Sequence, residues 1–235
     1  MSTGVILGIV LLVVLIGVGV ALAFALGKNS NDDNKATSIG LVDKVKVSVS
    51  GNWQQYETSI REASKVASSL FSDDIQLPIT FRATTGSNGS IIAAASMTNS
   101  SNVFAGGIIY IYTDYSGTPS SGYTEVLIHE ILHVMGIGTS SKWRNAILTG
   151  SLLDGNKFPY ALEEYQDLGG SGDNIPLGGD YEGHWRESTF GDEMMTPYVN
   201  GATDLKLSKL TGAALKDMGW SVNLTIPPFE TYVLP

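Results

Sequence analysis

The sequence of 235 residues contains no cysteine. This absence excludes disulfide bonds, thiolate metal sites and a cysteine nucleophile, and it removes cysteine usage as a guide to the redox compartment. A metal bound by side chains of this protein must therefore be held by histidine, aspartate or glutamate. Histidine is scarce as well, because only His129, His133 and His184 occur.

Positive charge is also in short supply. Lysine and arginine total 14 against 23 aspartate and glutamate residues, which gives a formal net charge of -9. An acidic protein repels a phosphate backbone, so we expect no nucleic-acid partner.

The first 27 residues lack charged side chains. Residues 4–27 are almost entirely apolar, and as a helix they would extend roughly 36 Å, enough to cross a bilayer core. The alternative is a signal peptide, because Ala21-Leu22-Ala23 fits a cleavage pattern, but the apolar run is long and no Lys or Arg precedes it. We predict a transmembrane anchor over residues 1–27, and hence a single-pass membrane protein.

The sequence gives conflicting signals about the side of the membrane on which the folded domain lies. Four lysines follow the apolar run, and the positive-inside rule places them in the cytoplasm. Three tripeptides fit the glycosylation pattern and favour the opposite side, although such tripeptides also arise by chance. The lysines are Lys28, Lys35, Lys44 and Lys46, and the tripeptides begin at Asn88, Asn99 and Asn223. We expect an extracytoplasmic domain.

The rest of the chain reads as one folded domain behind a short linker. Residues 28–38 are small and polar without an apolar period, which predicts a flexible tether. Residues 39–235 show no internal repeat and are enough for one sizeable core. We predict a single domain with two lobes, 39–136 and 137–235.

Apolar patterns predict a sheet covered by helices. Alternating or β-branched runs indicate four strands, and helical spacing indicates three helices. The strands cover 45–50, 77–84, 90–97 and 107–112, and the helices cover 53–71, 124–135 and 205–218. The inner face of the first helix comprises Ile60, Ala63, Ala67 and Leu70. We predict an α+β fold with a mixed twisted sheet, followed by an irregular second lobe that is mostly loop and ends in a helix.

The helix over 124–135 carries the sequence HEILH at residues 129–133. Two imidazoles four residues apart leave one face of a helix and can share one ion. A catalytic zinc takes three protein ligands and keeps one position for water, whose proton Glu130 would accept. Gly136 allows the helix to end and the chain to turn under the metal. The bare motif also arises by chance.

With Gly136 the pattern HExxHxxG of the metzincin zinc peptidases is complete. In most metzincins the third histidine follows that glycine closely, but Thr139 occupies the place here and the next histidine is His184. This insertion, and the sequence GHWRESTFGDEMMT at residues 183–196, resemble the leishmanolysin-like metallopeptidases. Residues 207–223 are similar to the C-terminal helix and strand of that family, so the likeness covers about residues 123–223.

The resemblance implies a metzincin-like fold and a zinc endopeptidase. It makes His184 the third zinc ligand, beside His129 and His133, and Met195 the methionine beneath the metal. Taken alone, His184 reads as a buried histidine packed against Trp185, and Met195 as core filling. The upstream sheet resembles the family less clearly, and the cysteines of some relatives are absent, so disulfides and loop details do not carry over.

We therefore expect hydrolysis of a protein or peptide substrate by a zinc-bound water that Glu130 activates. The substrate would lie along the edge strand near residues 90–97. The short tether leaves no room for a large blocking prosegment.

Two further groups are weaker candidates. Tyr198 follows the methionine turn and could stabilise an oxyanion. A loop rich in aspartate could bind calcium, although the pattern does not support it. Its acidic residues are Asp154, Asp167, Asp173 and Asp180.

Two rival functions stay open. One is a membrane-tethered surface or virion module, for binding or structure, that keeps zinc only to fix its loops; a closed zinc site of that kind needs a fourth protein ligand, and no fourth histidine exists. The other is a non-peptidase zinc hydrolase such as an amidase, because HExxH fixes the activation of water and not the substrate.

Overall fold

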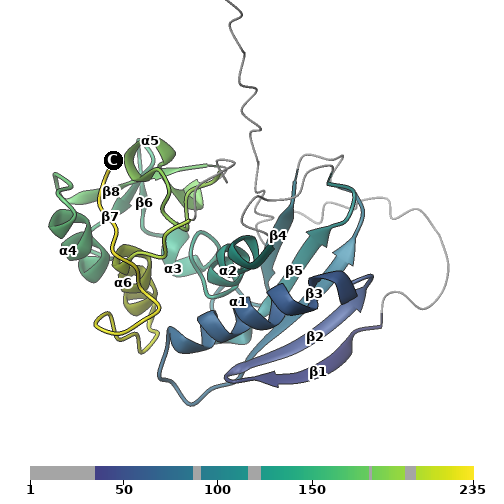
Figure 1. The fold of residues 1–235 in the computed structure, drawn as a ribbon. Helices are drawn as coiled ribbons and strands as arrows, with labels where there is room; N and C mark the ends of the chain where they lie inside the picture. Colours follow the sequence, from purple (N-terminus) through teal and green to yellow (C-terminus); the bar gives the residue numbers. More distant parts are fainter. Residues whose placement is uncertain (1–34, 87–90, 116–122, 180–181, 199–204) are drawn as a thin grey trace, which may run out of the picture.

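The computed structural model describes residues 35–86, 91–115, 123–179, 182–198 and 205–235, which form two lobes side by side (Figure 1). One lobe is a five-stranded sheet with two helices, and the other is built from short strands and helices. The fold is thus mixed α+β, as predicted.

Several predicted features lie outside the described residues. They are the anchor over 1–27, the tether residues 28–34, the tripeptide at Asn88 and the acidic residue Asp180. Across the described ranges, no helix is long and apolar enough to span a bilayer.

The first lobe is built on a mixed sheet with the strand order β1-β2-β3-β5-β4. The central strands β2, β3 and β5 run parallel, while β1 and β4 pair antiparallel with their neighbours. The strands are β1 (Thr37–Val42), β2 (Val45–Gly51), β3 (Leu77–Thr84), β4 (Ala93–Met97) and β5 (Gly107–Tyr112). Strand β1 was not predicted, because only Val42 in it is buried and no alternation shows.

Helix α1 (Glu57–Ser69) follows a short 3-10 turn, η1 (Gln54–Tyr56), and lies across the sheet. The four residues predicted for its inner face are all buried: Ile60, Ala63, Ala67 and Leu70. Ser68 fastens the helix to the β1–β2 turn. Its hydroxyl donates to the carbonyl of Val42 at 3.0 Å and accepts from the backbone N–H of Lys44 at 3.1 Å.

Helix α2 (Tyr123–Val134) packs beside α1 and against β4 and β5. The sequence predicts one apolar face on this helix. In the structure every residue from 126 to 134 is buried, because the second lobe covers the side that turns away from the sheet. A helix buried all round leaves no solvent-facing side, so the polar residues on it have to be accommodated inside the protein.

The second lobe holds a small antiparallel sheet of order β6-β7-β8-β9. The sequence analysis did not predict these strands, because strands of two to five residues are too short to show a period. Most of the described residues of this lobe lie outside helices and strands, as predicted. The elements are η2 (Val103–Ala105) in the first lobe, then α3 (Ser141–Arg144), β6 (Ile147–Leu148), β7 (Leu152–Asp154), α4 (Pro159–Asp167), β8 (Asn174–Gly178), β9 (His184–Trp185), α5 (Glu187–Phe190) and α6 (Lys209–Met218). Buried rings of Trp143, Phe158, Trp185 and Phe190 contact one another at its centre.

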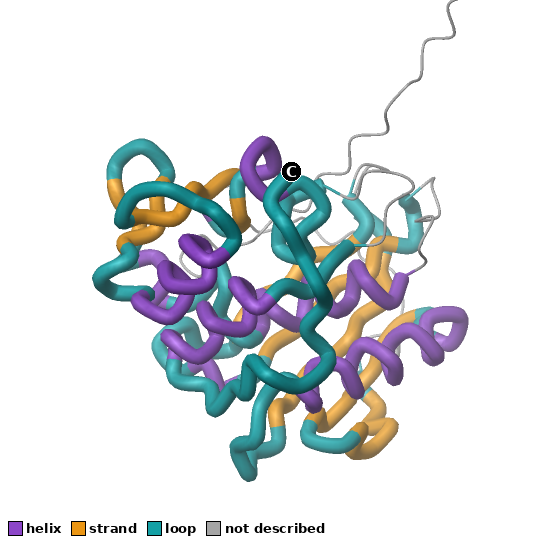
Figure 2. Tube along the Cα trace, turned by 60° about the vertical axis from the view of Figure 1, so that its left-hand side comes forward, coloured by secondary structure: helices purple, strands orange, loops and turns teal. Residues whose placement is uncertain are grey.

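The end of the chain ties the two lobes together. Helix α6 begins four residues later than predicted and ends at Gly219, whose left-handed backbone (φ 111°) suits glycine. The next residue, Trp220, is buried, and its indole N–H donates to the carbonyl of Met135 at 2.9 Å. The C-terminal segment then runs along the outside of the helices (Figure 2), where the hydroxyl of Tyr232 donates to the carbonyl of Phe190.

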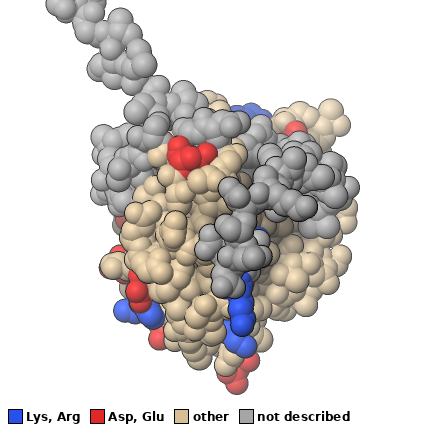
Figure 3. All heavy atoms as spheres, turned by 90° about the vertical axis from the view of Figure 1, so that its right-hand side faces the viewer, with Lys and Arg blue, Asp and Glu red and all other residues tan. Residues whose placement is uncertain are grey.

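Ion pairs on the surface contribute little to the stability of this fold. On the face shown in Figure 3, the described charged side chains form small groups among uncharged atoms. Ion pairs among the described residues include those of Arg61 with Glu57, Lys157 with Asp154 and Lys206 with Glu230. Partly exposed pairs of this kind contribute about 0–1 kcal/mol each, so apolar burial dominates the stability.

Replacing Trp220 by alanine is expected to lower the free energy of unfolding by about 3–5 kcal/mol, because the change leaves a large cavity and removes a donor from the Met135 carbonyl. Urea denaturation measures the effect. The matched control is Val233→Ala, since Val233 is 74 % exposed and its truncation should leave stability unchanged. Equal urea midpoints of unfolding for the two variants would contradict the role of Trp220 in joining the two lobes.

Candidate metal centre

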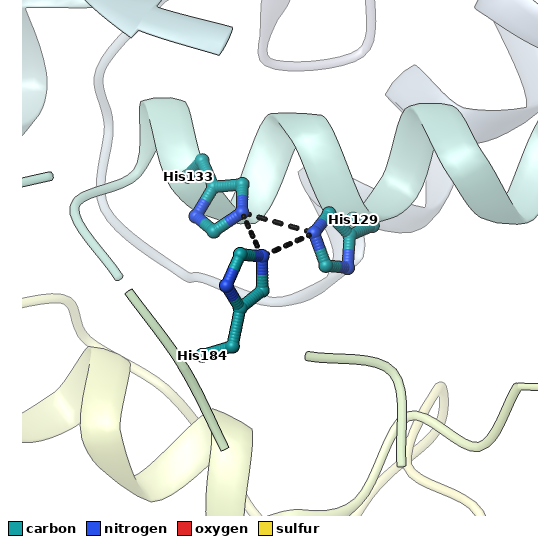
Figure 4. Close-up of side chains that lie close together, drawn as sticks. All are labelled: His129, His133 and His184. Carbon is teal, nitrogen blue, oxygen red and sulfur yellow. Dashed lines mark hydrogen bonds between the residues drawn. The ribbon is translucent and has the colours of Figure 1, made fainter. Parts of the chain in front are cut away.

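The three histidines of the chain meet between the two lobes (Figure 4). His129 and His133 leave one face of α2, one turn apart, and His184 is the first residue of β9. The Nε2 atom of His133 lies 2.9 Å from that of His129 and 3.2 Å from that of His184, and the third side of the triangle measures 3.3 Å. All three side chains are buried, and their Nε2 atoms face one common point.

Hydrogen bonds to the backbone fix the tautomer of two of the rings. Nδ1 of His129 lies 2.7 Å from the carbonyl oxygen of Met194, and Nδ1 of His133 lies 2.8 Å from that of Ile137. A carbonyl oxygen only accepts, so Nδ1 carries the hydrogen in both rings. When these rings are neutral, each Nε2 therefore presents a lone pair to the other, and a cation between them is needed to make the arrangement favourable.

Burial keeps the imidazoles neutral. It lowers the pKa of His129 to about 4, against the smaller opposing effect of the hydrogen bond to Met194. Burial also lowers the pKa of His133 and His184 well below the ordinary value, and the charge that neighbouring imidazoles would carry lowers it further. Neutral imidazoles are the form that binds a metal ion.

The spacing of the nitrogens is compatible with zinc. Tetrahedral zinc sits about 2.0–2.1 Å from each ligand nitrogen, which separates the nitrogens by about 3.3 Å. The observed separations of 2.9, 3.2 and 3.3 Å are close to this value. Among the residues that the structure describes, these histidines are the only cluster of potential ligands, and no carboxylate joins them. Asp154, Asp167 and Asp173 form no such cluster.

Glu130 lies next to His129 on α2 and is fully buried. Neither of its carboxylate oxygens has a hydrogen-bond partner among the described residues. Burial raises the pKa of Glu130 well above the ordinary value for glutamate. A buried carboxyl without partners costs stability, and such a group is characteristic of a functional site rather than of a structural one.

Gly136 ends the ligand-bearing helix as the sequence predicts. Its N–H bonds to the carbonyl of His133 at 3.0 Å, and the N–H of Ile137 reaches back to the carbonyl of Leu132 at 3.2 Å. These two bonds form a Schellman motif, in which the glycine takes a left-handed backbone, here with φ 119°. The motif aims the carbonyl of Ile137 at the ring of His133, so the helix end also orients a histidine.

A second close approach, which the sequence analysis missed, brings His184 to this helix end. Gly138 has φ 71°, and a Cβ atom placed on it would lie 2.3 Å from the carbonyl oxygen of Gly183. The backbone at Gly183 therefore touches the loop that leaves α2. Trp143 secures the same segment, because its indole N–H donates to the carbonyl of Glu182 at 3.0 Å.

Residues near His184 show the same tight packing. A Cβ on Gly179 would lie 2.5 Å from Nδ1 of His184, so only glycine allows this approach. Arg186, the residue after β9, donates to the carbonyl of Leu177 in β8 at 3.1 Å and to that of Ser151, in the turn before β7, at 3.0 Å. Lone glycines and a lone arginine carry no sequence signal for such roles.

Two further residues named in the sequence analysis, Met195 and Thr139, bond to the backbone beside the histidines. Met195 is fully buried, and its carbonyl accepts from the backbone N–H of Trp185 at 3.0 Å. Thr139, at the position where most metzincins have a histidine, is buried and donates its hydroxyl hydrogen to the carbonyl of His133. Tyr198 is partly exposed.

Two cavities of the described chain lie away from the histidines. One, of about 350 Å³, lies between α4, the start of α6 and the C-terminal segment, and the other, of about 210 Å³, lies at the carboxyl ends of β2 and β3. Neither is lined by a residue of the histidine cluster, so the candidate site rests on the chemistry of its ligands and not on cavity size.

Comparisons of the chain with protein-family models, with curated proteins and with solved structures gave no match. The interpretation of the site therefore depends on its own geometry.

We expect Gly138→Ala to weaken metal binding by about tenfold or more, because the new methyl group pushes Gly183 and His184 away from α2. Gly150→Ala is the matched control: Gly150 also has a positive φ, 88°, but no atom lies within 4 Å of the added carbon. Both variants should lose about 1–2 kcal/mol of stability through backbone strain. Competition with a chromogenic chelator measures zinc affinity. Weaker zinc binding in both variants, or unchanged zinc binding in both, would contradict the role of the contact between Gly138 and Gly183 in placing His184.

Proposed function

We propose that the protein is a zinc-dependent endopeptidase. The observation that carries the proposal is the pairing of a three-histidine cluster with a buried carboxyl, Glu130, that has no hydrogen-bond partner among the described residues. The resemblance of residues 123–223 to leishmanolysin-like peptidases supports the same reaction and a metzincin-like fold.

The chemistry divides between the metal and Glu130. Zinc bound to the three imidazoles supplies Lewis-acid catalysis, because it polarises a carbonyl group and eases the deprotonation of water. Glu130 takes a proton from the attacking water and delivers it to the nitrogen of the leaving amine. Burial raises the pKa of Glu130, which makes its carboxylate a stronger proton acceptor.

The three histidines have distinct positioning partners. The carbonyls of Met194 and Ile137 hold the rings of His129 and His133 in the orientation that turns Nε2 to the common centre. Backbone packing against Gly179 holds the ring of His184. Histidines fixed in this way would hold a zinc ion with three protein ligands, the number that a catalytic zinc site uses.

The substrate would bind as an added strand. Strand β4 is an edge of the five-stranded sheet, and it packs directly against the helix that carries the two histidines. An extended peptide paired with β4 would place its backbone close to α2 without requiring particular side chains. This geometry favours a polypeptide over a small amide.

The rival of a structural zinc module fits the site less well. Such a site is closed by four protein ligands, whereas the described residues offer three. A structural site also gives no reason to bury the unpartnered carboxyl of Glu130.

Glu130→Gln tests the mechanism in the purified full-length protein. The amide has the size of the carboxyl but cannot accept the proton, so hydrolysis of an unfolded protein substrate should fall by about 10²–10⁴-fold while zinc content stays at one per chain. His184→Ala, as the control, should lose zinc and hydrolysis together. Metal analysis and a peptide-release assay give the two readings.

Wild-type protein that holds zinc but cleaves no member of a broad panel of unfolded proteins would overturn the peptidase proposal. Cleavage of simple amides or esters in the same assay, without cleavage of polypeptides, would instead favour another zinc hydrolase.

The proposal includes anchoring through residues 4–27 with the domain outside the cytoplasm. In sealed cells, added protease should then digest residues 35–235, and washing with alkaline carbonate should leave the chain in the membrane fraction. Complete protection from the protease would place the domain on the cytoplasmic side, and release by carbonate would contradict the anchor.

A further inference from the structure

A second buried carboxylate, Glu193, lies near the metal centre without belonging to the histidine cluster. Its Oε2 atom accepts from the backbone N–H of Met195 at 2.6 Å. Its Oε1 atom accepts from the hydroxyls of Ser208 and Thr211, both at 2.6 Å, and from the backbone N–H of Ser208 at 3.4 Å. One oxygen thus binds within its own turn, and the other binds the first turn of α6.

Burying this group is costly. Burial raises the pKa of Glu193 to about 7, although the hydrogen bonds from Ser208, Thr211 and the backbone act in the opposite direction. A buried carboxyl is tolerated when several donors satisfy it, and these donors come from two separate segments of the chain. The side chain therefore works as a tie between the turn at 193–196 and α6.

The tied turn carries two carbonyl groups that reach the metal ligands. The carbonyl of Met194 accepts from Nδ1 of His129 at 2.7 Å. The carbonyl of Met195 accepts from the backbone N–H of Trp185, the residue after His184, at 3.0 Å. The turn thus bonds to the ring of His129, which comes from the first lobe, and to the backbone beside His184, which belongs to the second lobe.

A further bond closes this network. The indole N–H of Trp185 donates to the hydroxyl oxygen of Thr211 at 2.9 Å, and that hydroxyl donates to Glu193. The strand that presents His184 and the turn that orients His129 are therefore held by one carboxylate through one threonine. Displacing Glu193 would release both.

We infer that Glu193 is a positioning residue for the metal centre: its carboxylate fixes the carbonyls of Met194 and Met195 and so sets the orientation of His129 and His184. The inference rests on the metal site of the proposed function. It extends that proposal, because it assigns a role to a side chain that touches neither the metal position nor Glu130.

Asp217 provides a matched control on the same helix. It is a buried carboxylate of α6, and it accepts from the backbone N–H groups of Tyr160 at 3.2 Å and Ala161 at 2.9 Å. It ties α6 to α4, and none of its hydrogen bonds leads to a histidine of the cluster. Asp217→Ala should cost stability without changing the metal centre.

The experiment compares zinc affinity and the visible spectrum of bound Co²⁺ in the full-length wild type, Glu193→Ala, Glu193→Gln and Asp217→Ala. All four proteins are measured under conditions in which circular dichroism shows that each one is folded. Glu193→Ala is expected to bind zinc about 10–100-fold more weakly and to shift the Co²⁺ bands. Glu193→Gln should recover part of the affinity, because its amide oxygen can accept from Met195 while its amide nitrogen donates to the two hydroxyls.

Wild-type affinity and spectrum in Glu193→Ala would overturn the inference, as would an equal loss in Asp217→Ala, which would mark a general effect of stability. Should Glu193→Ala not fold, Ser208→Ala replaces it, since it removes one donor and is expected to weaken zinc binding several-fold; unchanged affinity there overturns the inference. A wild type that binds no zinc would refute the proposed metal site itself, whereas zinc binding that is indifferent to Glu193 refutes only the positioning role.

Discussion

The Nε2 atoms of His129, His133 and His184 lie 2.9 to 3.3 Å apart inside the protein, and backbone carbonyls fix two of the rings so that lone pairs face one another. Such an arrangement is repulsive unless a cation occupies the centre. The surrounding structure works to maintain it: the Schellman motif aims the carbonyl of Ile137, and β9 presents the third ring. Much of the second lobe can be understood as the support of this triangle.

At this candidate centre, burial favours metal binding by the imidazoles but costs stability at Glu130. Burial makes the imidazoles good ligands because it keeps them neutral, yet the same burial leaves Glu130 without a partner. Local rules of folding are typically broken at functional sites and compensated elsewhere. Here the compensation lies in the apolar core around the sheet and in the aromatic cluster of the second lobe.

The sequence was informative where the pattern is local. Helix α2, its end at Gly136 and the strands β2 to β5 follow from periodicity and from a glycine signal that acts over a few residues. The short strands β6 to β9 could not be predicted, because pairing with distant segments stabilises them. The approach of Gly138 to Gly183 and the bonds of Glu193 join residues far apart in sequence, and no local pattern announces them.

Trp220 lies near the end of the chain, yet its indole supports the carbonyl of Met135 at the end of the ligand-bearing helix. Synthesis proceeds from the N-terminus, so all three histidines leave the ribosome before this support does. A nascent chain therefore carries every ligand while it still lacks the element that closes the helix end.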